Sequence, residues 1–337
     1  MAGQGGCVGF FRIPVPSVLA PHLILETRPI GSLDVSVVGL GCNNFGWHID
    51  EAASRKVVDA ALDAGVNHFD TADVYGDTES ETILGRALGK RRDEAIIATK
   101  FGSELDEQHS GAAPEYVKQA CEASLRRLGT DRIDLYYLHK PDASTPIADT
   151  LGALDDLVRA GKVREIACSN LSPEQLRAAA AAAEGGARFV ALQNEYSLLH
   201  REPEEGTLAA SERLGLAFVP YFPLKSGLLT GKYRADEAAP ENTRLNASDE
   251  SRFSSMGDRL LTDENLETVE RLIAFAESRG HTILELAFSW LLAQPAVASV
   301  IAGATKPEQV RSNAAAAGWR LSEGELAEVE EALAQPA

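Results

Sequence analysis

Residues 66–100, VNHFDTADVYGDTESETILGRALGKRRDEAIIATK, contain one complete strand–helix–strand unit. The apolar run at 66–69 predicts a strand, the periodic stretch Glu79–Leu88 predicts a helix, and Ala95–Thr99 predicts a second strand. Two strands that are connected through a helix run parallel in one sheet. This unit therefore predicts an α/β protein with a parallel sheet.

The same alternation continues along the chain. Apolar, β-prone runs predict strands at Val35–Leu40, 66–69, Ala95–Thr99, Ile133–Leu138, Val163–Cys168, Phe189–Leu192, Leu216–Pro220 and Val297–Ile301. Helical periodicity and capping residues predict helices at 50–64, Glu79–Leu88, Pro114–Leu128, Pro146–Ala160, Pro173–Ala183, Thr207–Leu214, Asn265–Arg279, Thr282–Ala293, Pro307–Ala317 and Glu323–Leu333. Eight strands that alternate with helices favour a closed (β/α)8 TIM barrel, with extra C-terminal helices, over a doubly wound sheet.

Two segments depart from this alternation. Strand-like residues Ile24–Ile30, followed by Gly31 and Ser32, predict half of an N-terminal β-hairpin that closes the bottom of the barrel. The polar segment Thr230–Thr262 is longer than an ordinary connection, which indicates a functional flap.

We predict a single domain over residues 25–335, preceded by a disordered extension over residues 1–24. Pro14, Pro16 and Pro21 interrupt the apolar residues of this extension, which does not match a signal peptide. The formal net charge of -18 argues against nucleic acid or an anionic membrane as a partner, and no run is apolar enough to span a bilayer. The four cysteines are widely spaced and show no metal-ligand pattern, so we expect reduced thiols in a cytoplasmic protein.

A second candidate fold comes from residues 39–46, GLGCNNFG, which superficially suggest the glycine-rich loop of a Rossmann domain. Four residues separate the last two glycines, where the dinucleotide-binding pattern has two. No clear helix begins at Gly46 either. We therefore discount the Rossmann fold.

Four polar residues follow predicted strands: Asp70, Tyr75, Lys100 and His139. The carboxyl ends of barrel strands meet at one rim, so these side chains are expected to gather there. A carboxylate, a phenol, an ammonium and an imidazole together make a proton-transfer site. A purely structural interpretation remains open for each residue, with Asp70 and Lys100 as a rim ion pair, Tyr75 covering a turn and His139 in the core.

Seven segments in order resemble those of the aldo-keto reductases, in a bacterial, NADP-dependent form. They are FDTADVYG (69–76), ATKFG (98–102), LGTDRIDLYYLHKPD (128–142), CSN (168–170), QNEYS (193–197), PLKSGLLTGKY (223–233) and GATKPEQVRSN (303–313). The resemblance extends from about Leu25 to the last helix. It implies that an aldehyde or ketone is reduced to an alcohol by direct hydride transfer, without a metal.

The resemblance also implies a role for each of the four polar residues. Tyr75 would be the general acid, Lys100 its neighbour, Asp70 the partner of Lys100, and His139 the residue that orients the carbonyl. Electrostatics supports the roles of Tyr75 and Lys100, because a nearby ammonium stabilises a phenolate and lowers the pKa of the phenol. A carboxylate such as Asp70 in turn keeps a buried ammonium charged.

Cofactor contacts are implied at several strand ends. Ser169, Asn170 and Gln193 would bind the nicotinamide carboxamide, Tyr221 would stack on the ring, and residues 230–262 would fold over the cofactor as a lid. The full set of implied cofactor residues is Gly41, Cys42, Asn43, Asp70, Ser169, Asn170, Gln193, Tyr221, Phe222, Pro223, Leu224, Ser226, Gly227, Gly303, Thr305, Lys306, Gln309 and Asn313. Helix capping by Ser169 and Asn170, and core packing by Tyr221, remain alternatives.

NADP is favoured over NAD. The segment at 303–313 opens a helix, whose N-terminus suits a phosphate, and Lys306, Gln309, Arg311 and Asn313 are expected near an adenosine 2′-phosphate. The sequence departs from many members, which have Arg in place of Gln309 and Lys in place of Gly303. NAD therefore remains possible, and Lys306 and Arg311 could be ordinary surface charges.

The substrate is expected to be a small carbonyl compound, and the sequence does not identify it. Trp47 and His48 would wall the pocket and suit flat or apolar groups, whereas Lys140 would favour a phosphorylated or carboxylated aldehyde. Two other functions remain open: an NAD-linked sugar or alcohol dehydrogenase, and a nicotinamide-binding regulatory subunit with little turnover. The sequence leaves the oligomeric state undetermined.

Overall fold

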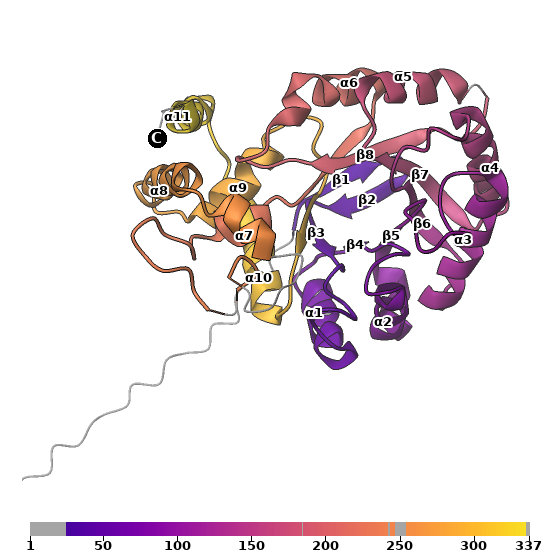
Figure 1. Ribbon diagram of the computed structural model, residues 1–337, viewed down its shortest axis with the longest axis horizontal. Helices are drawn as coiled ribbons and strands as arrows, with labels where there is room; N and C mark the ends of the chain where they lie inside the picture. Colours follow the sequence, from indigo (N-terminus) through magenta and orange to yellow (C-terminus); the bar gives the residue numbers. More distant parts are fainter. Residues whose placement is uncertain (1–24, 184, 242, 247–253, 335–337) are drawn as a thin grey trace, which may run out of the picture.

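A barrel of parallel strands forms the centre of the computed structural model, which describes residues 25–334 except 184, 242 and 247–253 (Figure 1). Within these residues the barrel strands are β3 (Val38–Gly41), β4 (His68–Asp70), β5 (Ile96–Phe101), β6 (Ile133–Leu138), β7 (Val163–Ser169), β8 (Phe189–Glu195), β9 (Ala217–Tyr221) and β10 (Val300–Gly303). Their order is β10-β3-β4-β5-β6-β7-β8-β9. The circle closes where the Phe218 amide donates to the Ala296 carbonyl, 2.7 Å away, and the Phe218 carbonyl accepts from the Ala298 amide at 3.0 Å. The predicted (β/α)8 barrel is confirmed.

Helices surround the barrel. They are α1 (Glu51–Asp63), α2 (Glu79–Leu88), α3 (Pro114–Leu128), α4 (Ile147–Arg159), α5 (Pro173–Ala182), α6 (Thr207–Leu214), α7 (Ser254–Leu260), α8 (Asp263–Glu277), α9 (Ile283–Leu292), α10 (Pro307–Ala315) and α11 (Glu323–Ala334). The capping signals act as expected, since Asp50 accepts from the Ala53 amide at the start of α1 and Gly129 ends α3 in the left-handed conformation.

The predicted N-terminal hairpin is present as the antiparallel pair β1 (Thr27–Ile30) and β2 (Leu33–Ser36). Its side chains Ile30, Leu33 and Val35 are buried in one cluster with inward-facing residues of the barrel strands, so the hairpin closes one end of the barrel. Ile24 and the predicted extension at 1–24 lie outside the described residues, as does residue 335.

One predicted strand is wrong. The continuous apolar run Val35–Leu40 predicts a single barrel strand, but its first residues belong to the hairpin and its last residues to β3. Val37 lies between the two, where its amide donates to the Glu26 carbonyl and its carbonyl accepts from the Val300 amide. Val37 thus marks the point at which the chain passes from the hairpin to the barrel. An unbroken apolar run gives no sign of where that passage occurs.

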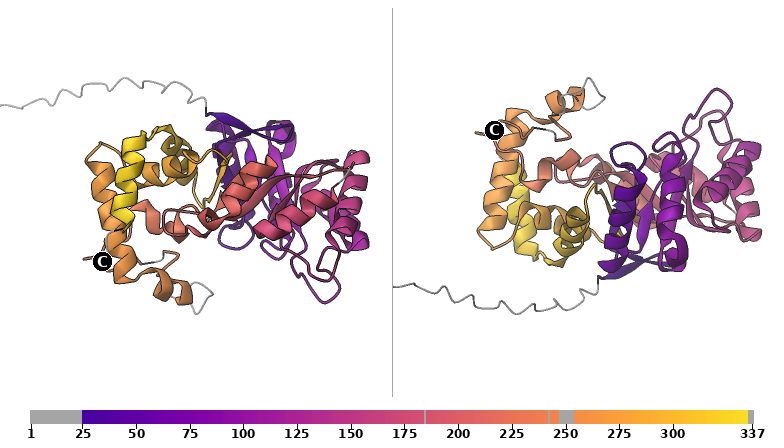
Figure 2. Two further views of the ribbon diagram at one scale, coloured as in Figure 1. Left: turned by 90° about the horizontal axis from the view of Figure 1, so that it is seen from above. Right: turned by 90° about the horizontal axis from the view of Figure 1, so that it is seen from below.

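The C-terminal helices form a group at one side of the barrel (Figure 2). Helices α8 and α11 pack against each other there. The long polar segment that precedes α8 contains α7, which the sequence pattern does not predict because this stretch has no clear apolar stripe.

We predict that packing between α2 and α3 requires glycine at position 85. A Cβ atom there would lie 2.1 Å from the Leu128 carbonyl oxygen, which is backbone and cannot move aside. Gly85→Ala should therefore lower the free energy of unfolding by about 2–4 kcal/mol, as measured by urea denaturation. Gly152→Ala in α4 is the matched control, because a Cβ added at Gly152 would meet nothing within 4 Å. This control should be neutral or stabilising by up to about 1 kcal/mol, and equal effects of the two variants would contradict the prediction.

Candidate active site

The four predicted proton-transfer residues lie together at the carboxyl ends of β4, β5 and β6. Asp70 is the last residue of β4, Lys100 is near the end of β5, and His139 follows β6 directly. The Lys100 Nζ donates to Asp70 Oδ2 at 2.7 Å and lies 5.1 Å from the centroid of the Tyr75 ring. The rings of Tyr75 and His139 are 6.0 Å apart, edge to face. These side chains therefore share one site, as their positions after the strands led us to expect.

The loop that carries Tyr75 is fixed by its backbone. The amides of Thr71 and Asp73 donate to the carbonyls of Ala98 and Lys100, which extends the ladder of β5 beyond the end of β4. At Gly76, φ is +58°, and a Cβ would lie 2.4 Å from the Phe45 carbonyl oxygen. Only glycine fits there, so the turn is tight and Tyr75 is held at a defined height above the strands.

Burial and charge act in opposite directions on Lys100 and Tyr75. Burial lowers the pKa of Lys100, but Asp70 and Tyr75 raise it by more, so the ammonium stays charged. For Tyr75, burial raises the pKa more than Lys100 lowers it, and the net pKa lies above its ordinary value. The expected lowering by Lys100 is therefore present but smaller than the effect of burial. Tyr75 keeps its proton at neutral pH, as a proton donor must.

His139 is a neutral imidazole throughout the ordinary pH range. Burial, followed by the nearby charges of Lys100 and Lys140, lowers its pKa to about 3. Its Nδ1 is buried without a hydrogen-bond partner among the described residues. A neutral imidazole carries one N–H group and can donate it to a carbonyl oxygen without adding a charge.

The residues expected to bind the carboxamide are joined to the proton-transfer group. Gln193 lies inside β8 rather than at its end, and its Nε2 donates to Asp70 Oδ1 at 2.8 Å. Asn170 donates to the His139 carbonyl and accepts from the Tyr221 hydroxyl, each at 3.0 Å. Ser169 donates to the Gln193 carbonyl at 2.6 Å. Ser172, rather than Ser169 or Asn170, caps α5, which removes the capping alternative.

The loop after β9 has an unusual backbone. Phe222, Lys225 and Ser226 all have φ between +43° and +58°, and Gly227 has φ of +96°. Each left-handed non-glycine residue costs about 1 kcal/mol or more, so such a run indicates a functional constraint. Two amides of this loop donate within it, that of Lys225 to the Phe222 carbonyl at 3.0 Å and that of Gly227 to the Leu224 carbonyl at 2.8 Å. The loop contains several of the residues expected to contact the cofactor, with Pro223 buried and Leu224 half-buried.

The N-terminus of α10 is a feature that suits an anion. Lys306 is its N-cap residue and is exposed, and its side chain makes no capping hydrogen bond. Gln309 instead accepts from the Thr305 amide at 2.7 Å, so its side chain is already engaged. Asn313 is buried on the same helix. Gly303 is exposed, and a Cβ there would lie 3.1 Å from Asn44 Nδ2.

Two residues that the sequence analysis missed connect these features. Arg244, from the long insert, donates to Asn44 Oδ1 at 2.8 Å, and Asn44 lies beside the predicted residues Gly41, Cys42 and Asn43. Burial lowers the pKa of Arg244. The insert therefore reaches across to the loop after β3. No local signal could reveal a contact between residues 200 positions apart.

The three residues expected to contact the substrate, Trp47, His48 and Lys140, are all exposed. Trp47 is 52% exposed and its ring stacks on that of His48, with centroids 4.3 Å apart. Trp47, Leu105 and Phe222, the most exposed large apolar side chains in the described part of the chain, all lie in loops after barrel strands.

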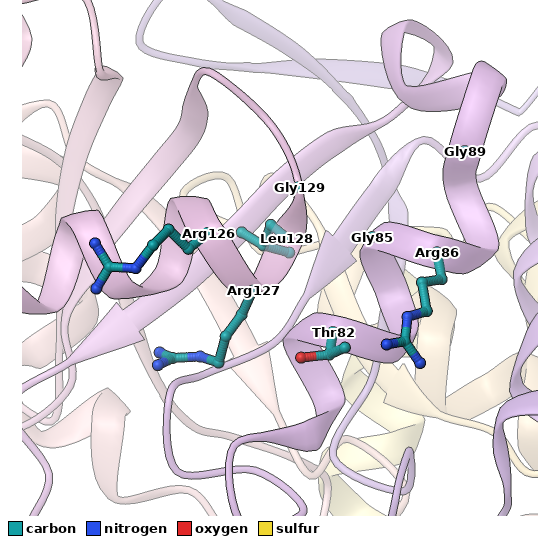
Figure 3. Close-up of a pocket in the computed structure, with 8 residues that line it drawn as sticks. All are labelled: Thr82, Gly85, Arg86, Gly89, Arg126, Arg127, Leu128 and Gly129. Atoms are coloured by element: carbon teal, nitrogen blue, oxygen red, sulfur yellow. The ribbon is translucent and has the colours of Figure 1, made fainter.

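Other features of the molecule lie away from this site. A cavity of about 530 Å³ lies between α2 and α3, and Figure 3 shows the residues that line it. Helices run antiparallel to the strands they follow, so this cavity is near the opposite end of the barrel. The described residues contain no cluster of His, Cys, Asp and Glu suited to a metal ion, and none of their helices has the length and apolar character of a membrane span.

Asp73 is a buried aspartate near the site that the sequence did not lead us to expect. It lies two residues before Tyr75 and is 1% exposed, and within the described part of the chain neither carboxyl oxygen accepts a hydrogen bond of ordinary geometry. Burial, followed by the charge of Glu81, raises its pKa to about 7, although Arg127 and the Val74 amide oppose the rise. No sequence pattern indicates this burial, because an aspartate in a turn is ordinarily exposed.

Comparison with known proteins gives one consistent result. A family model described as "Aldo/keto reductase family" matches residues 37–334. The chain is 36% identical to "Probable aldo-keto reductase 1" of Glycine max over 308 residues, which cover 89% of this chain and 86% of the relative. It is 36% identical to "Aldo-keto reductase str7" of Strobilurus tenacellus, with 90% and 91% covered. It is 34% identical to "Aldo-keto reductase yakc [NADP(+)]" of Schizosaccharomyces pombe, with 91% of each covered. These organisms are a plant and two fungi, so the bacterial form suggested by the motifs is not supported.

We predict that Asp73 makes the protein less stable as the pH rises. Its folded pKa of about 7 exceeds the ordinary value of 3.8, so the folded state holds the proton more tightly. Stability is then greatest below pH 4, falls between pH 4 and 7, and is constant above, with a total loss of at most about 4 kcal/mol.

Asp73→Asn should abolish this loss, so the variant should unfold at a higher temperature than the wild type at pH 8 and lose most of that advantage at pH 4. Thermal unfolding at several pH values measures both. Asp34→Asn, at an exposed aspartate, should follow the wild type. An Asp73→Asn variant with an unchanged pH dependence would show that Asp73 is ionised in the folded protein.

Proposed function

The chain belongs to the aldo/keto reductase family, and from this premise we propose that it reduces an aldehyde or ketone to an alcohol with NADPH and with Tyr75 as proton donor. The observation that carries the proposal is the contact between Asp70, Lys100 and Tyr75, in which a buried ammonium is held by a carboxylate and lies against a phenol. A structural ion pair alone would not need the phenol and the imidazole of His139 at the same opening.

The residues present fit a dinucleotide. The loop at 222–227 would lie along the pyrophosphate, and Lys306 at the N-terminus of α10 would hold the 2′-phosphate. Exposed Gly303 leaves room beside Asn43 and Asn44 for an approaching group. Arg244 would cover the bound cofactor from the insert. When bound, the reduced nicotinamide supplies the hydride that is added to the carbonyl carbon.

The chain itself handles the proton. As the carbonyl oxygen gains negative charge, the Tyr75 hydroxyl gives its proton to that oxygen, and the product is an alcohol and a Tyr75 phenolate. The Lys100 ammonium stabilises this phenolate, because opposite charges in a buried site attract strongly. The phenolate then regains a proton from solvent at the opening.

His139 orients the carbonyl in this scheme. Because its pKa of about 3 keeps it neutral, it can donate one hydrogen bond to the carbonyl oxygen but cannot compete with Tyr75 as an acid. Asn170 fixes its backbone through the His139 carbonyl. The imidazole, which follows β6, and the phenol, in the loop after β4, would thus approach the same oxygen.

NADP is proposed over NAD on the charges near α10. Lys306 is an exposed cation at a helix N-terminus, and one relative carries NADP(+) in its name. Since Gln309 caps the Thr305 amide, Lys306 is the principal candidate for the 2′-phosphate.

We predict that Tyr75→Phe stops carbonyl reduction but not cofactor binding. Removing the hydroxyl removes the proton donor, and loss of a general acid costs about 100-fold to 10,000-fold in rate. Stopped-flow oxidation of bound NADPH by a reactive aldehyde measures the rate, and quenching of protein fluorescence measures binding. A variant that keeps more than a tenth of the wild-type rate would remove Tyr75 from this role. A wild-type protein that binds NADPH without oxidising it would instead support the regulatory-subunit alternative.

We also predict that Lys306→Ala weakens NADPH binding by about tenfold, because one charge-assisted contact to the 2′-phosphate is worth about 1.4 kcal/mol. NADH lacks this phosphate, so its dissociation constant should change less than twofold. Lys56→Ala, at an exposed lysine of α1, is the control and should change neither. Equal weakening of both cofactors by Lys306→Ala would contradict the proposed 2′-phosphate contact.

A further inference from the structure

A polar layer lies inside the barrel, directly beneath the reacting groups. Asp70, Tyr137 and Gln193 come from β4, β6 and β8, which alternate around the barrel, and they are 3%, 0% and 2% exposed. In barrels of this type one layer is built from alternate strands and consists mostly of branched apolar side chains. In this protein three positions of that layer, Asp70, Tyr137 and Gln193, are polar. Asp70 and Gln193 have partners in the site, but nothing described so far accounts for Tyr137.

Tyr137 lies beside Lys100. The two residues are register partners in the parallel ladder of β5 and β6. The Lys100 Nζ is 5.9 Å from the centroid of the Tyr137 ring and 5.1 Å from that of Tyr75. Both distances are within the range of cation–π attraction. The ammonium therefore lies near two phenol rings, of which only Tyr75 is proposed to react.

The hydrogen bonds of Lys100 explain why a ring suits position 137. An ammonium has three N–H donors, and Lys100 uses two of them, at 2.7 Å to Asp70 Oδ2 and at 2.8 Å to the Thr71 carbonyl. The third remains for the Tyr75 oxygen. A polar oxygen on the β6 side would compete for that donor, whereas an aliphatic side chain would not attract the cation. An aromatic face attracts the ammonium without needing an N–H group of its own.

The hydroxyl group of Tyr137 is separate from the contact that its ring makes with Lys100. It is fully buried and has no hydrogen-bond partner of ordinary geometry within the described chain, although the Gln193 side chain lies near enough to oppose the rise in its pKa. Burial, followed by the charge of Asp70, raises the pKa of Tyr137 well above its ordinary value, so this phenol stays neutral. A buried hydroxyl without a good partner costs stability. Phenylalanine would carry no such cost, so the ring and the hydroxyl can be separated by mutation.

We propose that Tyr137 is a positioning residue for the proposed reduction, with its ring holding the Lys100 ammonium from the barrel interior so that the third N–H group faces Tyr75. Lysine has a long and flexible side chain, and fixing it in one conformation has an entropic cost. The ring limits its motion on the side that Asp70 and Thr71 leave open. This inference rests on the proposed function, because it assigns a role to the geometry of the same site.

The chain offers a matched control in Tyr136. It precedes Tyr137 on β6, is also 0% exposed, and also has an unpaired hydroxyl among the described residues. Its side chain points to the opposite face of the strand, where it packs against Phe101 with ring centroids 4.7 Å apart. Truncation of either tyrosine leaves a cavity of similar size in a buried region, but only Tyr137 contacts Lys100.

The experiment compares three variants in the full-length protein: Tyr137→Phe, Tyr137→Leu and Tyr136→Leu. With NADPH and a reactive aldehyde, Tyr137→Leu should lower kcat by tenfold or more with less than a threefold change in KM. Tyr137→Phe should keep kcat within threefold of the wild type and unfold at an equal or higher temperature. Tyr136→Leu should be about as destabilised as Tyr137→Leu but keep kcat within threefold. Equal loss of kcat in the two leucine variants, or a loss in Tyr137→Phe equal to that in Tyr137→Leu, would overturn the proposal.

A second readout does not depend on turnover. In protein with ¹⁵N-labelled lysine, a buried and bonded ammonium exchanges its protons slowly, and the Lys100 signal is identified by its loss in Lys100→Met. Exchange should stay slow in Tyr137→Phe and Tyr136→Leu and accelerate at least fivefold in Tyr137→Leu. Unchanged exchange in Tyr137→Leu would overturn the positioning role even if kcat fell. If the wild type shows slow exchange but no reduction of any carbonyl, the proposed function fails while the contact with Tyr137 remains testable.

Discussion

The ion pair between Lys100 and Asp70 is the interaction on which the rest of the site depends. Taking two charges out of water is costly, and a lone ammonium in this position would lose its proton. Asp70 accepts from Lys100 with one oxygen and from Gln193 with the other, so both of its oxygens are satisfied. The pair joins the carboxyl ends of β4 and β5, and so it also helps to hold the loop that carries Tyr75. Stability and chemistry at this rim thus have a common origin.

Much of this arrangement could be predicted from sequence because it depends on local patterns. Apolar runs that lead into Asp70 and Lys100, helices ended by glycine and the order of the motifs are sufficient for the barrel and for the group at its rim. The helix at Pro114–Leu128 is predicted to the residue, since proline and glycine mark its two ends. Predictions of this kind succeed where a single residue type has one physical role.

What could not be predicted depends on contacts between distant segments or on burial. The break at Val37 requires knowing which strands lie on each side of it, and the Arg244–Asn44 contact joins residues 200 positions apart. The balance at Tyr75 also escapes sequence reasoning, because the effect of Lys100 can be foreseen but the depth of burial cannot. Asp73 and Tyr137 are overlooked for the same reason, since their unusual character comes from burial without good hydrogen-bond partners.

The hairpin β1–β2 restricts the side of the barrel from which molecules can reach the site. Ile30, Leu33 and Val35 fill the end of the barrel opposite the site, so water cannot arrive from that side. In the proposed reduction, the carbonyl compound, the alcohol and the replacement proton would therefore all use the rim at the carboxyl ends of the strands. A short hairpin on the far side of the protein would thus confine the whole exchange to one face of the barrel.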